Sequence, residues 1–444
     1  WGARMLTPTA VAGLGSGVRA VDVNGPNACA VTAQGEVKCW HLFQPPATVA
    51  GLTGSIQAVA LGESHTCALT DAGGVQCWGE NYAGQLGDGT TNTRAEPVAV
   101  AGLASGVQAI AAGSSYTCAL TSGGGVKCWG SNNFGELGAD APLSAHSSTP
   151  LDVAGLDTGV QQIVAGWAHT CALLAGKGGR RVECWGANHS GALGDGTLIH
   201  RSTPVEVIGL DDDILAIGAG SDHACALRAG GGARCWGRNW SGQLGSGSSL
   251  WQLLPAPVVN LPADVQELAA GENHTCLLSG EAPAAGGVQC WGSNEDGQLG
   301  DGSLINRYQP AAVSGLAAGV RAIAAGNKHT CALSTAGGVQ CWGSNATGQL
   351  GDGTELPSAV PVSVIGLGSG VQAIAAGKGH TCAVTGSGGV QCWGDNKGGQ
   401  LGDGTQLNSK LPVDVVGLSS GVRAVAAGLG VTCALTEDGS VQCW

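Results

Sequence analysis

A cysteine-containing segment that recurs nine times and holds all 18 cysteines constrains the fold more than any other feature. A typical copy is GNKHTCALSTAGGVQCWG at 326–343. Two runs of β-favouring and small residues, 330–333 and 339–342, flank a Ser-Thr-Ala-Gly-Gly cluster that is typical of a turn. Folding the segment in the middle of that cluster places Cys331 opposite Cys341, close enough for a disulfide. The pattern predicts a disulfide-bonded β-hairpin.

The same geometry applies to every cysteine in the chain. Seven pairs are ten residues apart, and the other two have extra residues in the turn, which leaves the facing cysteines in place. The predicted pairs are Cys29 with Cys39, Cys67 with Cys77, Cys118 with Cys128, Cys171 with Cys184, Cys225 with Cys235, Cys276 with Cys290, Cys331 with Cys341, Cys382 with Cys392, and Cys433 with Cys443. Regular pairing of this kind indicates an oxidising, extracellular compartment.

Metal binding is the rival interpretation, because His-x-Cys places two ligands on one face of a strand and the partner strand offers a third. The repeats test this interpretation. Six units carry histidine at the position of His329, but Tyr116 and Val431 replace it in two others, where both cysteines are retained. The sequence therefore favours disulfides, no metal and no cofactor, with the histidines forming hydrogen bonds at the ends of strands.

Charge and hydropathy restrict the partners. The formal charge of −13 and the pI near 5.1 argue against a phosphate-binding surface, so we expect no nucleic-acid partner. No apolar run approaches the ~20 residues of a transmembrane helix, so we expect no membrane insertion.

Each full repeat contains four short strand-like segments separated by Gly, Pro and Asp-Gly turns, which is typical of a β-propeller blade. The segment VQAIAAG at 371–377 ends in small residues and is assigned to the inner part of a ring, where blades converge. The tryptophan that follows the second cysteine of each hairpin is expected to fill the space between neighbouring blades.

These motifs carry a resemblance to a known family. WGSNATGQLGDGT at 342–354 and PVSVIGL at 361–367 are similar to the repeats of the RCC1 family, whose members form seven-bladed β-propellers. The resemblance covers almost the whole chain. It implies the fold more strongly than a function, because this repeat serves nucleotide exchange, light sensing, enzyme inhibition and surface binding in different relatives.

The number of repeats differs from the family pattern. Residues 79–444 contain seven full-length repeats, whereas residues 1–78 contain two short repeats without the glycine-rich loop. We expect residues 1–444 to form one domain and favour a nine-bladed ring, with a seven-bladed ring plus two appended units or an open array as alternatives. The chain ends at nearly the repeat phase in which it begins. That arrangement permits ring closure, but it also permits a head-to-tail or stacked homo-oligomer.

The glycine-rich loop GQLGDGT does not match a phosphate-binding P-loop, because the required Lys-Ser/Thr is missing and no helix follows. Each loop also offers a single carboxylate, fewer than calcium requires, so Asp-Gly is interpreted as a turn. The sequence contains no unpaired cysteine, no G-x-S-x-G and no H-E-x-x-H. No catalytic residues are predicted, and we expect a protein that is not an enzyme.

Two family functions fit poorly. Light-sensing relatives use several Gly-Trp-Arg-His-Thr motifs, whereas GWAHT at 166–170 supplies one tryptophan without the arginine. Nucleotide exchange at chromatin is at odds with an acidic, cystine-rich chain. Our first hypothesis is a secreted or cell-surface propeller that binds a protein partner or assembles with itself, for example into filaments. The alternative is a secreted enzyme inhibitor similar to the RCC1-like inhibitor of β-lactamase.

Residues that break the repeat are the best candidates for a specific surface, because the shared residues build the scaffold. Aromatic and arginine side chains are also enriched at recognition sites. The predicted partner-binding residues are Trp167, Trp240, Trp251, Tyr82, Phe134, Tyr308, Arg180 and Arg181.

Overall fold

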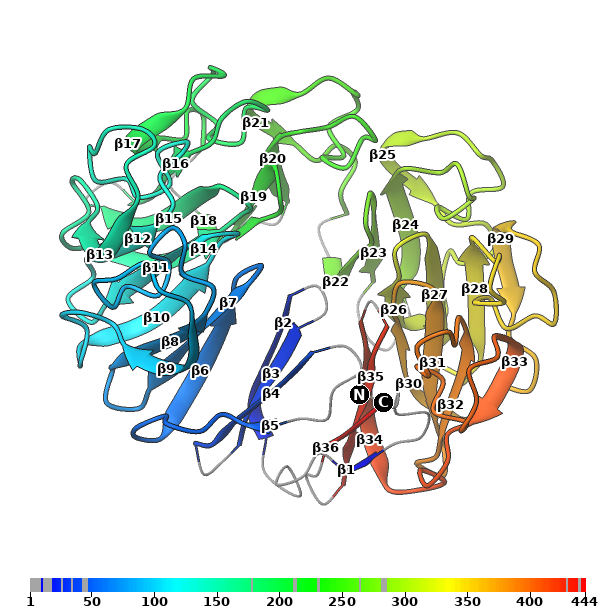
Figure 1. Cartoon of the computed structure of the whole chain (residues 1–444). Coiled ribbons are helices and arrows are strands. Elements are labelled where there is room, and N and C mark those ends of the chain that lie inside the picture. The colour runs from blue at the N-terminus through cyan, green and yellow to red at the C-terminus, as the bar shows by residue number, and fades with distance from the viewer. Residues whose placement is uncertain are drawn as a thin grey trace.

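The protein is described by a computed structural model that covers residues 9–10, 18–24, 27–32, 35–41, 47–176, 179–210, 214–229, 232–262, 265–280, 286–428, 430–437 and 441–444. Within these residues every regular element is a β-strand, and the strands form nine four-stranded antiparallel sheets. The sheets surround a common centre like propeller blades (Figure 1). The all-β, nine-unit prediction is confirmed, and the first two repeats contribute four-stranded sheets like the others.

The strands of each sheet follow in chain order from one edge to the other, except that β1 completes the last sheet. The sheets are β2 (Val18–Asn24), β3 (Asn27–Thr32), β4 (Val37–His41), β5 (Ala47–Thr48); β6 (Ile56–Leu61), β7 (His65–Thr70), β8 (Val75–Gly79), β9 (Arg94–Ala99); β10 (Val107–Ala112), β11 (Tyr116–Thr121), β12 (Val126–Gly130), β13 (Ser147–Asp152); β14 (Val160–Ala165), β15 (His169–Gly176), β16 (Gly179–Gly186), β17 (Arg201–Glu206); β18 (Ile214–Ala219), β19 (His223–Arg228), β20 (Ala233–Gly237), β21 (Gln252–Pro257); β22 (Val265–Ala270), β23 (His274–Ser279), β24 (Gly287–Gly292), β25 (Arg307–Ala312); β26 (Val320–Ala325), β27 (His329–Ser334), β28 (Val339–Gly343), β29 (Ser358–Ser363); β30 (Val371–Ala376), β31 (His380–Thr385), β32 (Val390–Gly394), β33 (Ser409–Asp414); and β34 (Val422–Ala427), β35 (Thr432–Thr436), β36 (Val441–Cys443), β1 (Thr9–Ala10).

The second and third strands of every sheet form the cysteine hairpin. In β27 and β28, Cys331 lies directly opposite Cys341, and Thr330 opposite Trp342. The structure joins the cysteines in nine disulfides, each with a Cα–Cα distance of 4.1 Å. The longer turns of two hairpins lie beyond this register, so they leave the facing cysteines paired.

The fourth strand of each sheet comes from the repeat that follows. β29 begins after the Cys-Trp of β28 and pairs with it, so a boundary drawn after the tryptophan, like the one between residues 78 and 79, separates the fourth strand from its sheet. The first such strand in the chain, β1, pairs with β36 through Thr9 opposite Cys443 and Ala10 opposite Gln442. The beginning and the end of the chain therefore share one sheet.

Hydrophobic side chains between adjacent sheets form the core. One cluster contains Cys331 and Leu333 of β27, Val371 of β30, and Ala383 and Trp393 of the following hairpin. Small residues of the first strand, such as those of β30, face the neighbouring sheets near the centre, where large side chains would collide. The core is thus a series of thin layers, each made by two neighbouring sheets.

The glycine-rich loop between the third and fourth strands covers the tryptophan of the next sheet. The Trp393 indole nitrogen donates a hydrogen bond to the Gln349 carbonyl oxygen at 2.9 Å, and the side chain is fully buried. Gly351 has a φ of +69°, and a Cβ there would lie 2.8 Å from the Trp393 indole nitrogen. Six other tryptophans donate an equivalent bond: Trp129, Trp185, Trp236, Trp291, Trp342 and Trp444. The loop is therefore a packing element, and its second glycine is required by the indole.

We predict that Trp393→Ala lowers the free energy of unfolding by about 3 to 5 kcal/mol, because it empties a buried site and removes the bond to Gln349. Trp78→Ala is the matched control. Trp78 follows a short repeat and remains partly exposed, so its loss is expected to be smaller. Urea unfolding followed by circular dichroism measures both variants. Equal losses would contradict the covering role of the loop.

A histidine in each of several sheets forms a hydrogen bond to the next sheet. His329 Nε2 lies 2.9 Å from Thr381 Oγ1, and the Thr381 hydroxyl donates to the Gln349 carbonyl oxygen at 3.0 Å. Because the hydroxyl proton is used in that bond, Nε2 must be the donor to Thr381 and Nδ1 carries no proton. The ring lies against Gly326, where a Cβ would be 2.3 Å from His329 Cε1. The histidine motif is thus a contact between sheets.

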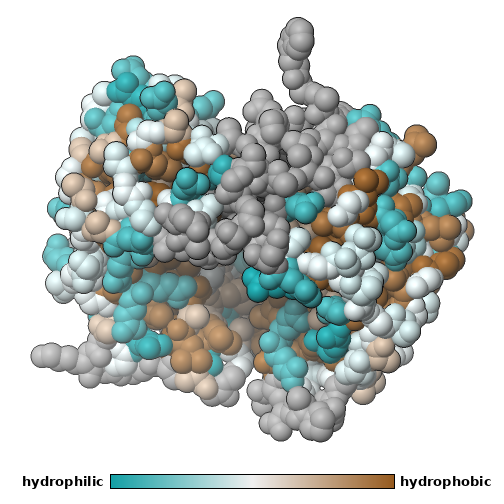
Figure 2. All heavy atoms as spheres, turned by 90° about the horizontal axis from the view of Figure 1, so that it is seen from below, coloured by the Kyte–Doolittle hydropathy of each residue, from teal (hydrophilic) through white to brown (hydrophobic). Residues whose placement is uncertain are grey.

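A proline lies within the outer strand of seven sheets. These residues are Pro97, Pro150, Pro204, Pro255, Pro310, Pro361 and Pro412. Proline lacks the N–H that a further strand would need, and it is a common means of protecting an exposed sheet edge. Seen from below, hydrophobic and hydrophilic side chains are interspersed over the described surface (Figure 2).

Candidate functional site

The loops of the propeller gather on two faces. Loops that join the first to the second strand and the third to the fourth strand lie at one end of the antiparallel sheets, here called the long-loop face. The hairpin turns and the links between sheets lie at the other end, the hairpin face. Six of the predicted partner-binding residues are on the long-loop face: Tyr82, Phe134, Trp167, Trp240, Trp251 and Tyr308. Arg180 and Arg181 are at the hairpin end of β16.

The long loops are held by internal hydrogen bonds. In the second sheet, the Asp88 carboxylate accepts bonds from the Thr90 backbone nitrogen at 2.9 Å and from Arg94 Nε at 3.0 Å. Burial raises the pKa of Asp88, but the hydrogen bonds from Thr90 and Arg94 outweigh it and lower the pKa overall. Asp195 and Asp301 are bonded in the same way. These carboxylates therefore stabilise the turn.

Three aromatic residues from three consecutive sheets surround one pocket on the long-loop face. Tyr82 is 63% exposed and Trp167 is 48% exposed, while Phe134 is half-buried between them. The ring centroids of Phe134 and Trp167 are 6.4 Å apart. The Tyr82 hydroxyl lies 2.7 Å from Ser115 Oγ. The pocket has a volume of about 460 Å³, and Glu63, Glu136 and His146 also line it.

The backbone positions Trp167 at this pocket. Its carbonyl oxygen accepts a hydrogen bond from the Ser114 nitrogen at 3.1 Å, and its nitrogen donates to the Ser221 carbonyl oxygen at 3.3 Å. The Glu63 nitrogen in turn donates to the Ser114 carbonyl oxygen at 3.2 Å. The loops between first and second strands thus form a belt of hydrogen bonds from sheet to sheet, which fixes Trp167 beside the neighbouring long loop.

Two residues beneath this pocket differ from their equivalents in other repeats. Tyr116 replaces the usual histidine, is buried, and donates from its hydroxyl to the His169 carbonyl oxygen at 2.6 Å. Burial raises the pKa of Tyr116, so it is neutral. Glu136 replaces the usual glutamine and is 3% exposed. Burial raises the pKa of its carboxyl group, although bonds from the Phe134 backbone and Ser131 lower it in part. Glu136 is not among the residues predicted from the sequence, although aligning GELG with GQLG identifies it as a departure from the repeat.

The remaining aromatic candidates form a second group. The rings of Trp240 and Trp251 are 5.6 Å apart at their centroids, and the Arg238 guanidinium lies 4.3 Å from the centroid of Trp240. Trp240 is 60% exposed. Tyr308 contacts the same loop, since a Cβ on Gly242 would lie 2.5 Å from Tyr308 Cδ1. In this group the Arg238 side chain already covers one face of the Trp240 ring.

The two arginine candidates are separated from the aromatic residues. Arg180 donates to the Ile214 carbonyl oxygen of the next sheet at 3.0 Å, and Arg181 forms an ion pair with Glu183 at 2.8 Å. Both interactions lie at the hairpin face. The structure therefore brings the aromatic candidates to one face and places the arginines on the other.

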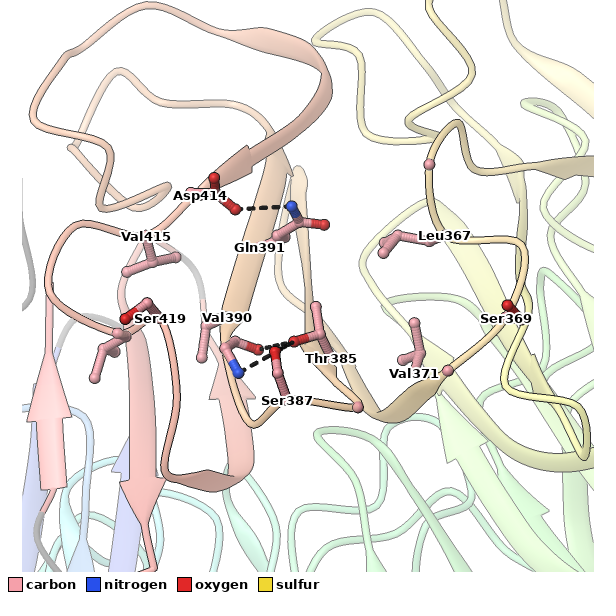
Figure 3. A pocket seen from close by; sticks show the side chains of 15 residues that line it. Leu367, Ser369, Val371, Thr385, Ser387, Val390, Gln391, Asp414, Val415 and Ser419 are labelled. Carbon is pink, nitrogen blue, oxygen red and sulfur yellow. Dashed lines mark hydrogen bonds between the residues drawn. The ribbon is translucent and has the colours of Figure 1, made fainter.

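A second pocket, of about 490 Å³, lies on the hairpin face (Figure 3). Its polar side chains bond one another: Gln391 Nε2 donates to the Asp414 carboxylate at 2.8 Å, and Thr385 Oγ1 lies 3.0 Å from Ser387 Oγ. Figure 3 shows these bonds at the pocket wall. Because the polar groups are satisfied within the hairpin and its neighbouring strand, this pocket is a weaker candidate than the aromatic one.

Two further features concern the described part of the chain. No group of three or more His, Cys, Asp or Glu residues is arranged to hold a metal ion there. No helix among the described residues is long and apolar enough to cross a membrane.

Comparisons with known proteins agree with the fold. The sequence profile of the RCC1-like domain matches residues 39–318 and 146–444. The ultraviolet-B receptor UVR8 of Arabidopsis thaliana is 32% identical over 289 residues, which are 64% of this chain and 64% of UVR8. The human E3 ubiquitin-protein ligase HERC2 is 33% identical over 340 residues, which are 74% of this chain and 7% of HERC2. The alignments thus span less than two thirds of either relative.

Among solved structures, human WBSCR16 superposes with a TM-score of 0.50 at 22% sequence identity, covering 83% of this chain and 98% of that one. This similarity concerns the fold. The profile match, which spans residues 39–444, shows that the chain belongs to the RCC1-like domain family.

Proposed function

We propose that the protein is a non-enzymatic, secreted or cell-surface propeller that binds a protein partner through its long-loop face. The observation that carries the proposal is the gathering of exposed aromatic side chains on that face, at positions where most other repeats have small or polar residues. Aromatic side chains bury a large area with few rotatable bonds, so they are effective at recognition surfaces. Residues 1–444 would act as one domain, with short repeats in 1–78 and full-length repeats in 79–444.

Two features support the non-enzymatic and extracellular parts of the proposal. The repeated histidines and loop aspartates are engaged in bonds that hold sheets and turns together. The disulfides fit an oxidising compartment. The prolines of the outer strands disfavour self-assembly by edge-to-edge strand pairing, so we favour a different protein as the partner over a filament of identical copies.

The test is capture of a partner from the extracellular fraction of the cells that produce the protein. The double variant Trp167→Ala/Trp240→Ala should lose the partner that the wild type retains, since it removes one aromatic anchor from each group. The double variant Arg180→Ala/Arg181→Ala, on the hairpin face, is the matched control and should retain it. Loss with the control variant alone would contradict the assignment of the face. Stacked rings or fibres in negative-stain images would favour self-assembly.

A further inference from the structure

Glu136 is a buried carboxylate without a cationic partner. The Phe134 backbone nitrogen donates to Glu136 Oε2 at 2.7 Å, and Ser131 Oγ lies 3.4 Å from Oε1. Among the described residues, no lysine, arginine or histidine forms an ion pair with Glu136. Carboxylates are rarely this buried unless a cation accompanies them.

The other repeats show that the loop itself does not need this charge. Five of them carry glutamine at the same position, and its Oε1 accepts the same backbone bond. In the seventh sheet the Thr347 nitrogen donates to Gln349 Oε1 at 3.0 Å. The corresponding bonds of Gln85, Gln243, Gln298 and Gln400 are 2.8 to 3.1 Å. Glutamine therefore performs the structural task, and the extra negative charge of Glu136 has no structural reason.

The pocket above Glu136 has walls suited to a cation. Tyr82, Phe134 and Trp167 line it, and so does Glu63, which is exposed. A cationic group over an aromatic ring gains attraction from the ring quadrupole, and the gain increases in a desolvated site. Phe134 is the only aromatic residue at its position among the seven long loops, and the position of Tyr82 is aromatic in one other loop, as Trp240. The aromatic walls and the buried charge thus occur together at one place on the ring.

We propose that this pocket binds the cationic side chain of a lysine or arginine that projects from the partner protein. The apolar stem would lie between the aromatic rings, and the charged end would reach the Glu136 carboxylate. An anionic ligand is disfavoured by the two carboxylates, and a purely apolar ligand would leave Glu136 buried and unpaired. Trp240, on the same face, already has a cation over its ring, because the Arg238 guanidinium lies there. This inference rests on the proposed function and names the chemistry of its partner.

The experiment uses the full chain and four probes, with binding followed by saturation-transfer NMR of the probe. The probes are N-acetyl-lysine methylamide, N-acetyl-arginine methylamide, the uncharged isostere N-acetyl-norleucine methylamide, and tetramethylammonium. The lysine or arginine probe should bind, and norleucine should not. Glu136→Gln should raise the Kd of the cationic probe about tenfold, which corresponds to about 1.4 kcal/mol. Trp167→Ala should raise it about fivefold or more through loss of the ring.

Controls keep the outcomes separate. Glu136→Gln should unfold at the same temperature as the wild type or higher, because five repeats already use glutamine there and the buried charge is removed. Arg180→Ala/Arg181→Ala, on the hairpin face, should leave probe binding unchanged. Equal binding by norleucine, or an unchanged Kd in Glu136→Gln, would overturn the inference, and tighter binding of tetramethylammonium would assign the pocket to a free quaternary amine instead. If these probes fail while Trp167→Ala/Trp240→Ala still loses the captured partner, the proposed function stands without this inference.

Discussion

Lowering the pH from about 7 to about 4.5 is expected to destabilise the propeller by about 10 kcal/mol, because five buried histidines oppose protonation. Burial lowers the pKa of His65, His169, His274 and His380 from 6.5 to about 4, and that of His329 to about 3. The unfolded chain takes up protons below about pH 6.5 while the folded state does not. The stabilisation is therefore complete above that pH and is lost as the pH falls toward 4.

The size of the effect follows from the same shifts. Each histidine contributes about 2 to 3 kcal/mol between these limits, at about 1.36 kcal/mol for each pH unit. The structural reason is that Nδ1 of His65, His274, His329 and His380 is buried without a hydrogen-bond partner, so a proton there would bring an unpaired charge. The loop aspartates act in a separate window, because the pKa of Asp88, Asp195 and Asp301 is lowered and their contribution is lost at still lower pH.

Urea unfolding at a series of pH values measures this dependence. His329→Gln should be less stable at pH 7, since it disturbs the contact with Thr381, but its stability should fall less steeply with pH because one titrating group is gone. His189→Gln is the matched control, since His189 is exposed. Identical pH dependence in wild type and His329→Gln would show that burial of this histidine does not govern acid stability.

The hairpin register and the number of sheets were predictable from sequence because they depend on local spacing. Cysteines at equal distances from a turn must face each other, as Cys331 and Cys341 do. The sheet to which a fourth strand belongs was not predictable in the same way. In the chain, β29 lies in the repeat that comes after Trp342, but in the structure it completes the sheet of the preceding hairpin. Strand pairing depends on contacts in space, which the order of residues does not determine.

The aromatic pocket was predictable only in part. Tyr82, Phe134 and Trp167 were recognised individually as departures from the repeat, but they occupy three different repeat positions. Their assembly depends on the angle between sheets and on the belt of backbone bonds through Ser114 and Trp167. Glu136 was not predicted because, in the sequence, glutamate in place of glutamine looks like an exchange of two exposed polar side chains. Its burial arises from the loop that folds over it.

Reduction of the disulfides is expected to have the largest effect on stability. Closing a loop of ten residues should contribute about 2.5 to 3 kcal/mol for each bond by the chain-entropy estimate. The double variant Cys331→Ala/Cys341→Ala should therefore lose about 3 kcal/mol in urea unfolding, and full reduction in denaturant should prevent refolding until the thiols are reoxidised. Intact mass without reductant should be lower than that of the reduced chain by 18 hydrogens, two for each of the nine bonds.

The order in which the bonds open tests the packing as well as the chemistry. Cys331 and Cys341 are fully buried between sheets, whereas Cys39, Cys225 and Cys433 are only half-buried. A water-soluble reductant acting on the folded protein should therefore open the bonds of Cys39, Cys225 and Cys433 first, because thiol exchange requires access to sulfur. Alkylation followed by peptide mass measures the order. Equal rates for all nine bonds would mean that the sheets separate before reduction. Free thiols in protein taken from its natural location would contradict both the disulfide-bonded hairpin and the extracellular assignment, since each depends on an oxidising compartment.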